Sequence, residues 1–223
     1  MGEMVKFRAN GREADGYLAT PIGKGPGVVV IQEWWGLVPQ IKGVCDRLAN
    51  EGFVALAPDL YRGETTRSPD EAGKKMMALR IEETEKELRG AIQYLAGHQT
   101  VQPRKIGTIG FCMGGALSLF AASKNQEVDA CVVFYGGHPN VHPDLPKLRA
   151  PVLGIYGAKD TFVSPEAVRQ LDAELTRLGK RHEFHTYPGV DHAFFNETGK
   201  NYDASSATDA WRRTVEFLNR ELK

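Results

Sequence analysis

Five short apolar runs, separated by stretches of helical periodicity, constrain the fold of this chain more than any other feature. The runs are continuous rather than alternating, which is typical of strands buried on both faces of a parallel sheet. They span residues 28–32, 53–57, 105–110, 130–135 and 152–156. Strand and helix in repeated alternation predict right-handed crossovers and a doubly wound, mostly parallel α/β sheet.

Turn and cap residues predict where several elements begin and end. The segment before the first apolar run alternates around Asn10-Gly11, a pair suited to a tight turn, and so predicts an N-terminal antiparallel hairpin. A helix is expected to follow Ser164, with Pro165 at its first position and Gly179 just beyond its end. No internal repeat or linker divides the chain, so we expect a single domain over residues 1–223.

Charge and composition narrow the class of partner. Lys plus Arg (28) equals Asp plus Glu (28), and no block of like charge indicates nucleic acid or a membrane surface. The sequence has neither a secretory signal pattern nor an apolar run long enough to cross a bilayer. Three cysteines without metal-type spacing suggest free thiols. We therefore expect a cytoplasmic protein, a monomer or small homo-oligomer, that acts on a small molecule.

A cysteine between two glycines is the strongest chemical signal. Gly110, Cys112 and Gly114 form a G-x-C-x-G motif between an apolar strand and a helical stretch, the context of a nucleophile elbow. Cys112 would lie over a helix N-terminus, which favours a thiolate. The alternative is that Cys112 is a small core residue. Cys45 and Cys131 lack such a context and are expected to be packing residues.

An acid and a histidine follow Cys112 in the chain order of an α/β-hydrolase triad. Asp160 comes directly after an apolar strand, at the sheet edge where α/β sites are built. His192 follows the next predicted strand, in "YPGVDHAF". Asp191 is a possible substitute acid, ranked below Asp160 because neighbouring side chains seldom point at one another. The sequence thus predicts that Cys112, Asp160 and His192 converge.

Two other histidines suggest a metal site only weakly. His138 and His142 lie in "GGHPNVHP", but no carboxylate or cysteine stands at matching spacing, so we expect no metal and no cofactor. The segment from Tyr61 to Leu79 interrupts the strand and helix alternation and is a candidate cover for the site. No insertion is large enough for a separate lid domain.

The stretch "QEWWG" at the end of the first apolar run can complete an oxyanion hole. In this fold, the backbone N–H after the nucleophile acts together with an N–H from the loop that follows this strand. Met113 and Trp34 are the candidates. The paired Trp34 and Trp35 rings could equally form an apolar wall for a substrate.

These motifs together resemble the dienelactone hydrolases, a family of cysteine-dependent α/β hydrolases. The resemblance covers almost the whole chain through "QEWWG", "APDLYRG", "GFCMGGA", "FYGGHP", "GAKD" and "YPGVDHAF", in the family's order. It implies an α/β-hydrolase fold that hydrolyses small lactones or activated esters, as a carboxymethylenebutenolidase does. It also implies Cys112 as nucleophile, His192 as base and acid, Asp160 as its orienter and Glu33 as a carboxylate near the resting thiol.

The substrate-binding residues depart from the family pattern. The resemblance implies arginines for a substrate carboxylate, but Asn196 holds one of those places, and Arg67 is the candidate for the other. Trp35, Phe111 and Phe194 are the further candidates for substrate contact. A small ester or lactone other than a dienelactone fits this departure. A non-catalytic ligand-binding protein and a thiol redox sensor of the same fold are the alternative functions.

Overall fold

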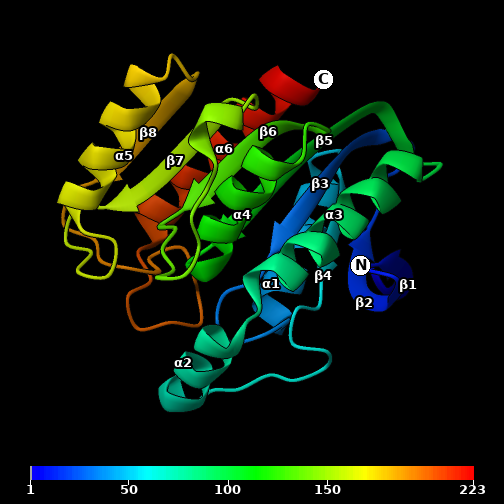
Figure 1. The fold of residues 1–223 in the computed structure, drawn as a ribbon, viewed down its shortest axis with the longest axis horizontal. Helices are drawn as coiled ribbons and strands as arrows, with labels where there is room; N and C mark the ends of the chain where they lie inside the picture. The colour runs from blue at the N-terminus through cyan, green and yellow to red at the C-terminus, as the bar shows by residue number, and fades with distance from the viewer. Residues whose placement is uncertain (1) are drawn as a thin grey trace.

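One sheet of eight strands organises the chain in the computed structural model, which describes residues 2–223 (Figure 1). Its spatial order is β1-β2-β4-β3-β5-β6-β7-β8. The strands are β1(Glu3–Ala9), β2(Arg12–Ala19), β3(Gly25–Ile31), β4(Val54–Pro58), β5(Val101–Phe111), β6(Val128–Phe134), β7(Val152–Gly157) and β8(His182–Tyr187). Strands β4, β3, β5, β6, β7 and β8 are parallel, whereas β2 pairs antiparallel with both β1 and β4. The predicted doubly wound sheet with an antiparallel hairpin is therefore confirmed.

Helices cover both faces of this sheet. They are α1(Pro39–Asn50), α2(Pro69–Ala78), α3(Ile81–Gly97), α4(Met113–Lys124), α5(Pro165–Arg177) and α6(Ala204–Leu222), with a short 3₁₀ helix, η1(Leu145–Lys147). The buried side chains of α1 and α6 join one apolar core, and those of α3, α4 and α5 join the other. Helix α2 projects below the sheet in Figure 1. The two cores leave the carboxyl ends of the parallel strands free for a site.

Local signals placed several boundaries correctly. Asn10 and Gly11 have φ angles of 50° and 71°, as a tight hairpin turn requires. The Ser164 side chain accepts a hydrogen bond from Ala167 N at 3.2 Å and so caps α5. Gly179, at φ 64°, adopts the left-handed conformation just beyond α5, where glycine is favoured.

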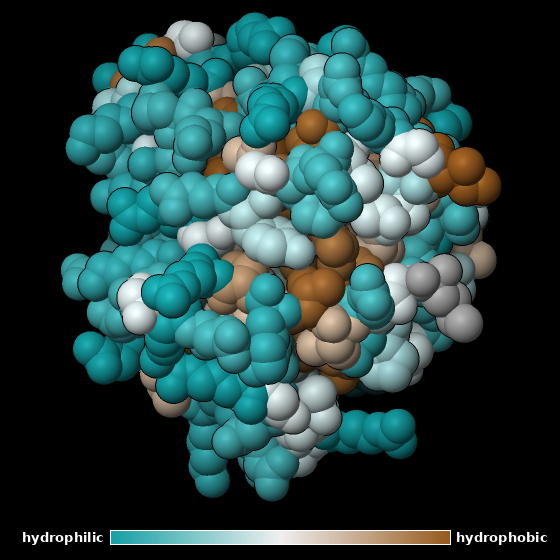
Figure 2. Space-filling view, turned by 90° about the vertical axis from the view of Figure 1, so that its right-hand side faces the viewer, coloured by the Kyte–Doolittle hydropathy of each residue, from teal (hydrophilic) through white to brown (hydrophobic). Residues whose placement is uncertain are grey.

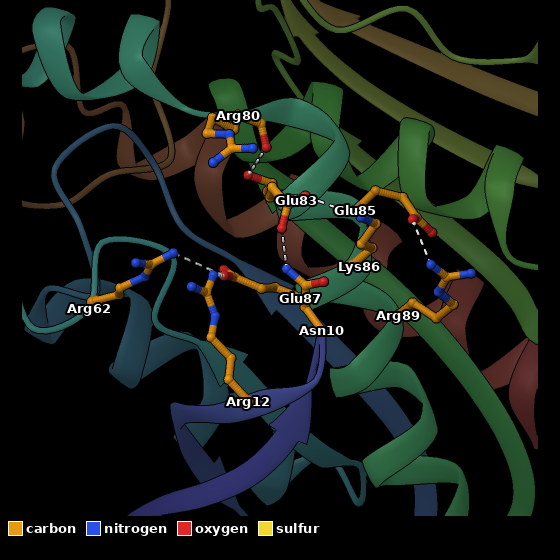
Figure 3. Close-up of polar contacts among 10 residues, drawn as sticks. Asn10, Arg12, Arg62, Arg80, Glu83, Glu85, Lys86, Glu87 and Arg89 are labelled. Carbon is orange, nitrogen blue, oxygen red and sulfur yellow. Dashed lines mark hydrogen bonds and ion pairs between the residues drawn. The ribbon is translucent and has the colours of Figure 1, made fainter.

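Charged side chains tie the N-terminal hairpin to α3 (Figure 3). Arg12, on β2, pairs with Glu87 of α3, and Arg62, from the loop after β4, lies 3.4 Å from the same carboxylate oxygen. In the turn of the hairpin, Asn10 donates to Glu83. The hairpin and the loop after β4 therefore both contact α3, and these contacts attach the hairpin to the rest of the domain.

The hairpin also forms one edge of the sheet, where unpaired strand groups could attract another chain. Figure 2 faces this side of the molecule and shows hydrophilic side chains over most of it, with hydrophobic ones in a narrow band near the middle. Lys6 on β1 pairs with Glu13 and Asp15 on β2, at 2.8 and 3.4 Å. Such charges on an edge disfavour strand-to-strand association.

Within residues 2–223, no helix combines the length and the apolarity that crossing a bilayer requires.

Candidate active site

A strained turn carries Cys112 from β5 into α4. Its φ of 56° and ψ of −121° are unusual for a residue with a side chain, and such strain costs on the order of 1–3 kcal/mol where the surrounding structure imposes it. The Cys112 N–H donates to Phe134 O at 3.1 Å, and its carbonyl accepts from Gly115 N at 2.9 Å. The predicted elbow geometry is thus present.

The flanking glycines are required by close backbone contacts. A Cβ on Gly110 would lie 1.8 Å from the carbonyl oxygen of Gly114, and one on Gly114 would lie 2.4 Å from the carbonyl oxygens of Ile31 and Gln32. Distances this short are impossible for a side chain. The spacing of the motif therefore follows from how closely β5, α4 and β3 approach at this turn.

The Cys112 thiol is buried and lines a cavity. Burial raises the pKa of Cys112, the negative charge of Glu33 raises it further, and the Met113 backbone N–H opposes both. The helix N-terminus was expected to favour a thiolate, and the Met113 N–H acts in that direction, but the loss of hydration outweighs it. The resting group is therefore a thiol, which needs a nearby acceptor for its proton.

Asp160 and His192 meet beside this thiol, from the loops that follow β7 and β8. Asp160 Oδ2 lies 2.8 Å from His192 Nδ1, while its Oδ1 accepts from the N–H groups of Phe162 and Val163, both at 2.8 Å. Because the carboxylate only accepts hydrogen bonds, Nδ1 carries the proton and Nε2 presents its lone pair. Among residues 2–223, Nε2 has no hydrogen-bond partner, although it is buried. It is therefore free to take a proton.

The alternative acid, Asp191, has a different role in this geometry. Its Oδ1 accepts from the backbone N–H of His192 at 2.6 Å, not from the ring. The Asn201 side chain donates to His192 O at 2.9 Å and holds the same loop. Asp160, and not Asp191, is thus the carboxylate in contact with the imidazole, and its role as the orienting acid stays a prediction.

Glu33 lies buried at the end of β3 with both carboxylate oxygens engaged. Asn196 Nδ2 donates to Oε2 at 2.7 Å, and Tyr135 OH donates to Oε1 at 3.3 Å. Burial raises the pKa of Glu33, and the bonds from Asn196 and Tyr135, together with nearby His192, only partly offset it. Thr198 donates to Asn196 Oδ1 from its backbone and its hydroxyl, so the Asn196 amide is fixed with its N–H₂ toward Glu33. Every group that stabilises this carboxylate by hydrogen bonding is neutral.

A cavity of about 550 Å³ joins these groups. Its walls are mainly apolar and come from the loops after β3, β7 and β8 and from α2. The lining residues are Glu33, Trp34, Trp35, Pro69, Met76, Cys112, Phe162, His192, Ala193, Asn196, Gly199, Lys200 and Asn201. Size and lining suit a small organic molecule.

The predicted oxyanion donors, Met113 and Trp34, belong to the start of α4 and the loop after β3. Met113 is the first residue of α4, where a backbone N–H has no partner within the helix. Trp34 lines the cavity, and its ring meets that of Trp35 edge to face, with centroids 5.0 Å apart. That these two N–H groups form an oxyanion hole stays a prediction.

Of the four predicted substrate-binding residues, one lines the cavity and three do not. Trp35 lines the cavity, whereas Arg67 is exposed and is not among the lining residues. Phe111 stacks on Phe195 behind the site, and Phe194 packs against Tyr135. Both are fully buried core residues, so they support the wall and do not form its surface.

Seven lining residues were not singled out from the sequence: Pro69, Met76, Phe162, Ala193, Gly199, Lys200 and Asn201. Phe162 lies two positions after Asp160, is half exposed, and meets the His192 ring edge to face at 5.1 Å. Pro69 and Met76 bring α2 into the wall, so the segment from Tyr61 to Leu79 does border the site. The sequence signal for Phe162 was an aromatic residue two positions after the candidate acid, Asp160.

His138, one of the two histidines considered for a metal, contacts neighbouring backbone groups. His138 Nε2 lies 3.1 Å from Met76 O, and its Nδ1 accepts from Asn140 N at 3.0 Å, so both ring nitrogens have partners within the protein. Among residues 2–223, no cluster of three or more His, Cys, Asp or Glu side chains has a metal-binding arrangement. His138 therefore fastens the end of α2 beside the cavity.

A strained strand-to-helix turn at the carboxyl edge of a doubly wound sheet, with an acid and a histidine in contact on later loops, is typical of the α/β-hydrolase fold. The described residues contain no separate lid domain. Residues 14–222 match the dienelactone hydrolase family, and the chain belongs to that family.

Named relatives and solved structures agree with this assignment. "Protein usf" of Aquifex pyrophilus is 40% identical over 230 residues, and a "Putative carboxymethylenebutenolidase" of Aquifex aeolicus is 38% identical over 231, each covering 100% of both chains. A crystal structure titled "Putative Dienelactone Hydrolase" from Klebsiella pneumoniae aligns with a TM-score of 0.90 and 28% identity, over 99% of this chain and 98% of that one. The predicted family resemblance is confirmed.

Proposed function

We propose that this protein hydrolyses small lactones or activated carboxylic esters through a covalent acyl-enzyme on Cys112. One observation carries the proposal: a buried cysteine on a strained turn shares a cavity with a histidine whose Nδ1 is held 2.8 Å from Asp160. Strain and an unpartnered buried imidazole nitrogen both cost stability, and such costs concentrate at functional sites. The 38% identity to a relative named for carboxymethylenebutenolidase activity supports the same reaction class.

Acylation begins with loss of the thiol proton. Glu33 is a buried carboxylate whose pKa is raised, so it is a better proton acceptor than an exposed one. The Cys112 thiolate attacks the substrate carbonyl carbon, and the N–H groups of Met113 and Trp34 receive the developing oxyanion. The C–O bond then breaks, and the leaving oxygen becomes a stabilised anion, which in an ester departs and in a lactone stays attached to the acyl group. This anion takes the proton from Glu33, and Glu33 returns to its ionised form.

Deacylation uses the other pair of groups. His192 Nε2 removes a proton from water, and the resulting hydroxide attacks the thioester carbonyl. Asp160 stabilises the imidazolium that forms. When the C–S bond breaks, the imidazolium returns its proton to the Cys112 sulfur and the carboxylic acid is released. One water is consumed for each ester or lactone bond.

The test is intact-protein mass spectrometry after brief mixing with a panel of lactones, enol esters and aryl esters. We expect a transient mass increase equal to the acyl group on the wild type and none on Cys112→Ala. Cys112→Ala is also expected to lose hydrolysis while keeping its melting temperature. Unchanged hydrolysis by folded Cys112→Ala would overturn the proposal.

The same experiment separates the two alternative functions. Tight ligand binding without an adduct or turnover would indicate a binding protein. Rapid oxidation of Cys112 by peroxide, again without turnover, would indicate a redox sensor; within residues 2–223, Cys112 is the only cysteine among the cavity-lining residues, so a resolving thiol is not at hand. A cytoplasmic location and the oligomeric state stay predictions.

A further inference from the structure

The buried charged side chain at the cavity is acidic, and no buried lysine or arginine lines the cavity beside it. Glu33 is buried against the cavity, and besides the His192 imidazole the one basic side chain among the described lining residues is Lys200, which is exposed. None of the described lining residues is an arginine. An anionic part of a substrate would thus enter a space that already contains a buried carboxylate.

We infer that the cavity selects substrates whose acyl part is uncharged and largely apolar, and that it rejects esters or lactones bearing a free carboxylate. The inference rests on the proposed function, since it concerns the acyl group that Cys112 would carry. It goes further by naming the chemical class of substrate.

Glu33 supplies the first reason. Its hydrogen bonds come from the amide of Asn196 and the phenol of Tyr135, so no arginine or lysine is paired with it, and His192 only partly offsets the effect of its burial. In acylation, the proton moves from Cys112 to Glu33, so the pair keeps one negative charge throughout. A substrate carboxylate would face that charge in a space with little water, where like charges repel strongly.

The walls supply the second reason. Most of the wall is apolar side-chain surface, from Trp34, Trp35, Met76, Phe162 and Ala193. A carboxylate placed against them would lose hydration without gaining a partner, which is costly. An alkyl or aromatic acyl group would instead bury its surface against the same side chains.

The experiment compares two esters of nearly equal shape. One is 4-nitrophenyl hydrogen succinate, which carries a carboxylate at pH 7.5, and the other is its methyl ester, which does not. We expect the wild type to favour the neutral ester by about 100-fold in kcat/KM, because placing like charges together at a binding site costs several kcal/mol. Rates are corrected for each ester's spontaneous hydrolysis, and the acyl mass on Cys112 is recorded for both.

Two pairs of variants show which feature is responsible. Met76→Lys puts an ammonium into the wall and should reduce the preference for the neutral ester at least tenfold, whereas Met76→Gln, equally polar but uncharged, should not. Lys200→Met should leave the preference within about twofold, because an exposed ammonium is well hydrated and screened. If Met76→Lys fails to fold, the wild-type ratio still decides the matter.

The outcomes distinguish the inference from the function on which it rests. Equal rates for the two esters, or a preference for the anionic one, with acylation of Cys112 by both, would overturn the inference and leave the proposed function standing. A strong neutral preference that Met76→Gln abolishes as fully as Met76→Lys would also overturn its electrostatic part. No acyl mass from either ester or from the wider panel would overturn the proposed function itself.

Discussion

Two buried glutamates in this molecule have opposite surroundings. Glu87, on α3, receives Arg12 and Arg62, and its side chain is 9% exposed (Figure 3). Glu33, at the end of β3, is as well buried but receives only the Asn196 amide and the Tyr135 hydroxyl. Two arginines contact the first carboxylate, whereas only neutral groups donate hydrogen bonds to the second.

The difference shows two ways in which this fold holds a buried glutamate. Guanidinium groups contact Glu87 and join three chain segments. Around Glu33, the neutral donors leave burial as the largest influence on its pKa, which is raised. In the mechanism that we propose, Glu33 is the carboxylate that accepts the proton of Cys112.

The largest expected effect comes from removing the charge of Glu33. Glu33→Gln should lower kcat/KM by about 10²–10³-fold, the range for a lost proton acceptor, because the buried thiol then has no adjacent carboxylate. Its melting temperature should stay the same or rise, since a buried charge is removed. Steady-state kinetics with an aryl ester and a thermal melt check both. The matched Glu87→Gln variant should keep kcat/KM within about twofold of the wild type, because Glu87 does not touch the reacting groups.

If Glu87→Gln lost as much activity as Glu33→Gln, the division between the two glutamates would be wrong. If Glu33→Gln kept full activity, the thiol proton would have to leave by another route. His192 Nε2 is then the remaining acceptor in the cavity.

The second prediction concerns pH. If ionised Glu33 takes the thiol proton, kcat/KM should rise with pH through the raised pKa of this group, giving an acidic limb. The Asn196 bond lowers the pKa of Glu33, so Asn196→Ala should raise that pKa and move the limb to higher pH. Tyr135→Phe should move it in the same direction by less, because its hydrogen bond is longer. A pH profile of kcat/KM checks the shift, and a limb that stays in place in both variants would contradict it.

The sequence predicted the parts of this site that are local. The elbow around Cys112, the strand before Asp160 and the loop of His192 each have a signature within a few residues, and the order of the strands brings them together. The Asn10-Gly11 turn was predictable for the same reason: the pair itself favours positive φ angles.

Contacts between distant segments were not predictable in this way. Tyr135 is 102 residues from Glu33, and Asn196 is 163 residues from it, and no periodicity links them. Phe111 and Phe194 were expected to contact substrate, but residues close to a site residue in sequence can point into the core, as these do. Tertiary packing decides which neighbour reaches the cavity.

The third prediction returns to Glu87 and concerns stability. Glu87→Gln should lower the free energy of unfolding by about 2 kcal/mol, the scale of charge-assisted hydrogen bonds lost from a buried group. Urea unfolding monitored by circular dichroism checks this. Glu82→Gln, on the exposed face of the same helix, is the control and should change stability by less than about 0.5 kcal/mol. If the Glu87→Gln protein were as stable as the control, the contacts of Arg12 and Arg62 with Glu87 would contribute nothing to the free energy of unfolding.

The smallest effects separate the two arginines. Arg12 is 40% exposed and lies in close contact with Glu87, whereas Arg62 is 67% exposed and 3.4 Å away. Arg12→Gln should therefore cost about 1 kcal/mol and Arg62→Gln less than about 0.5 kcal/mol, as for an exposed ion pair. Added salt should reduce the Arg62 difference further, since water screens that pair more. Equal losses in urea unfolding would show that proximity and burial do not rank these two contacts. A larger loss for Arg12 would instead assign most of the compensation of Glu87 to β2, and so to the attachment of the hairpin.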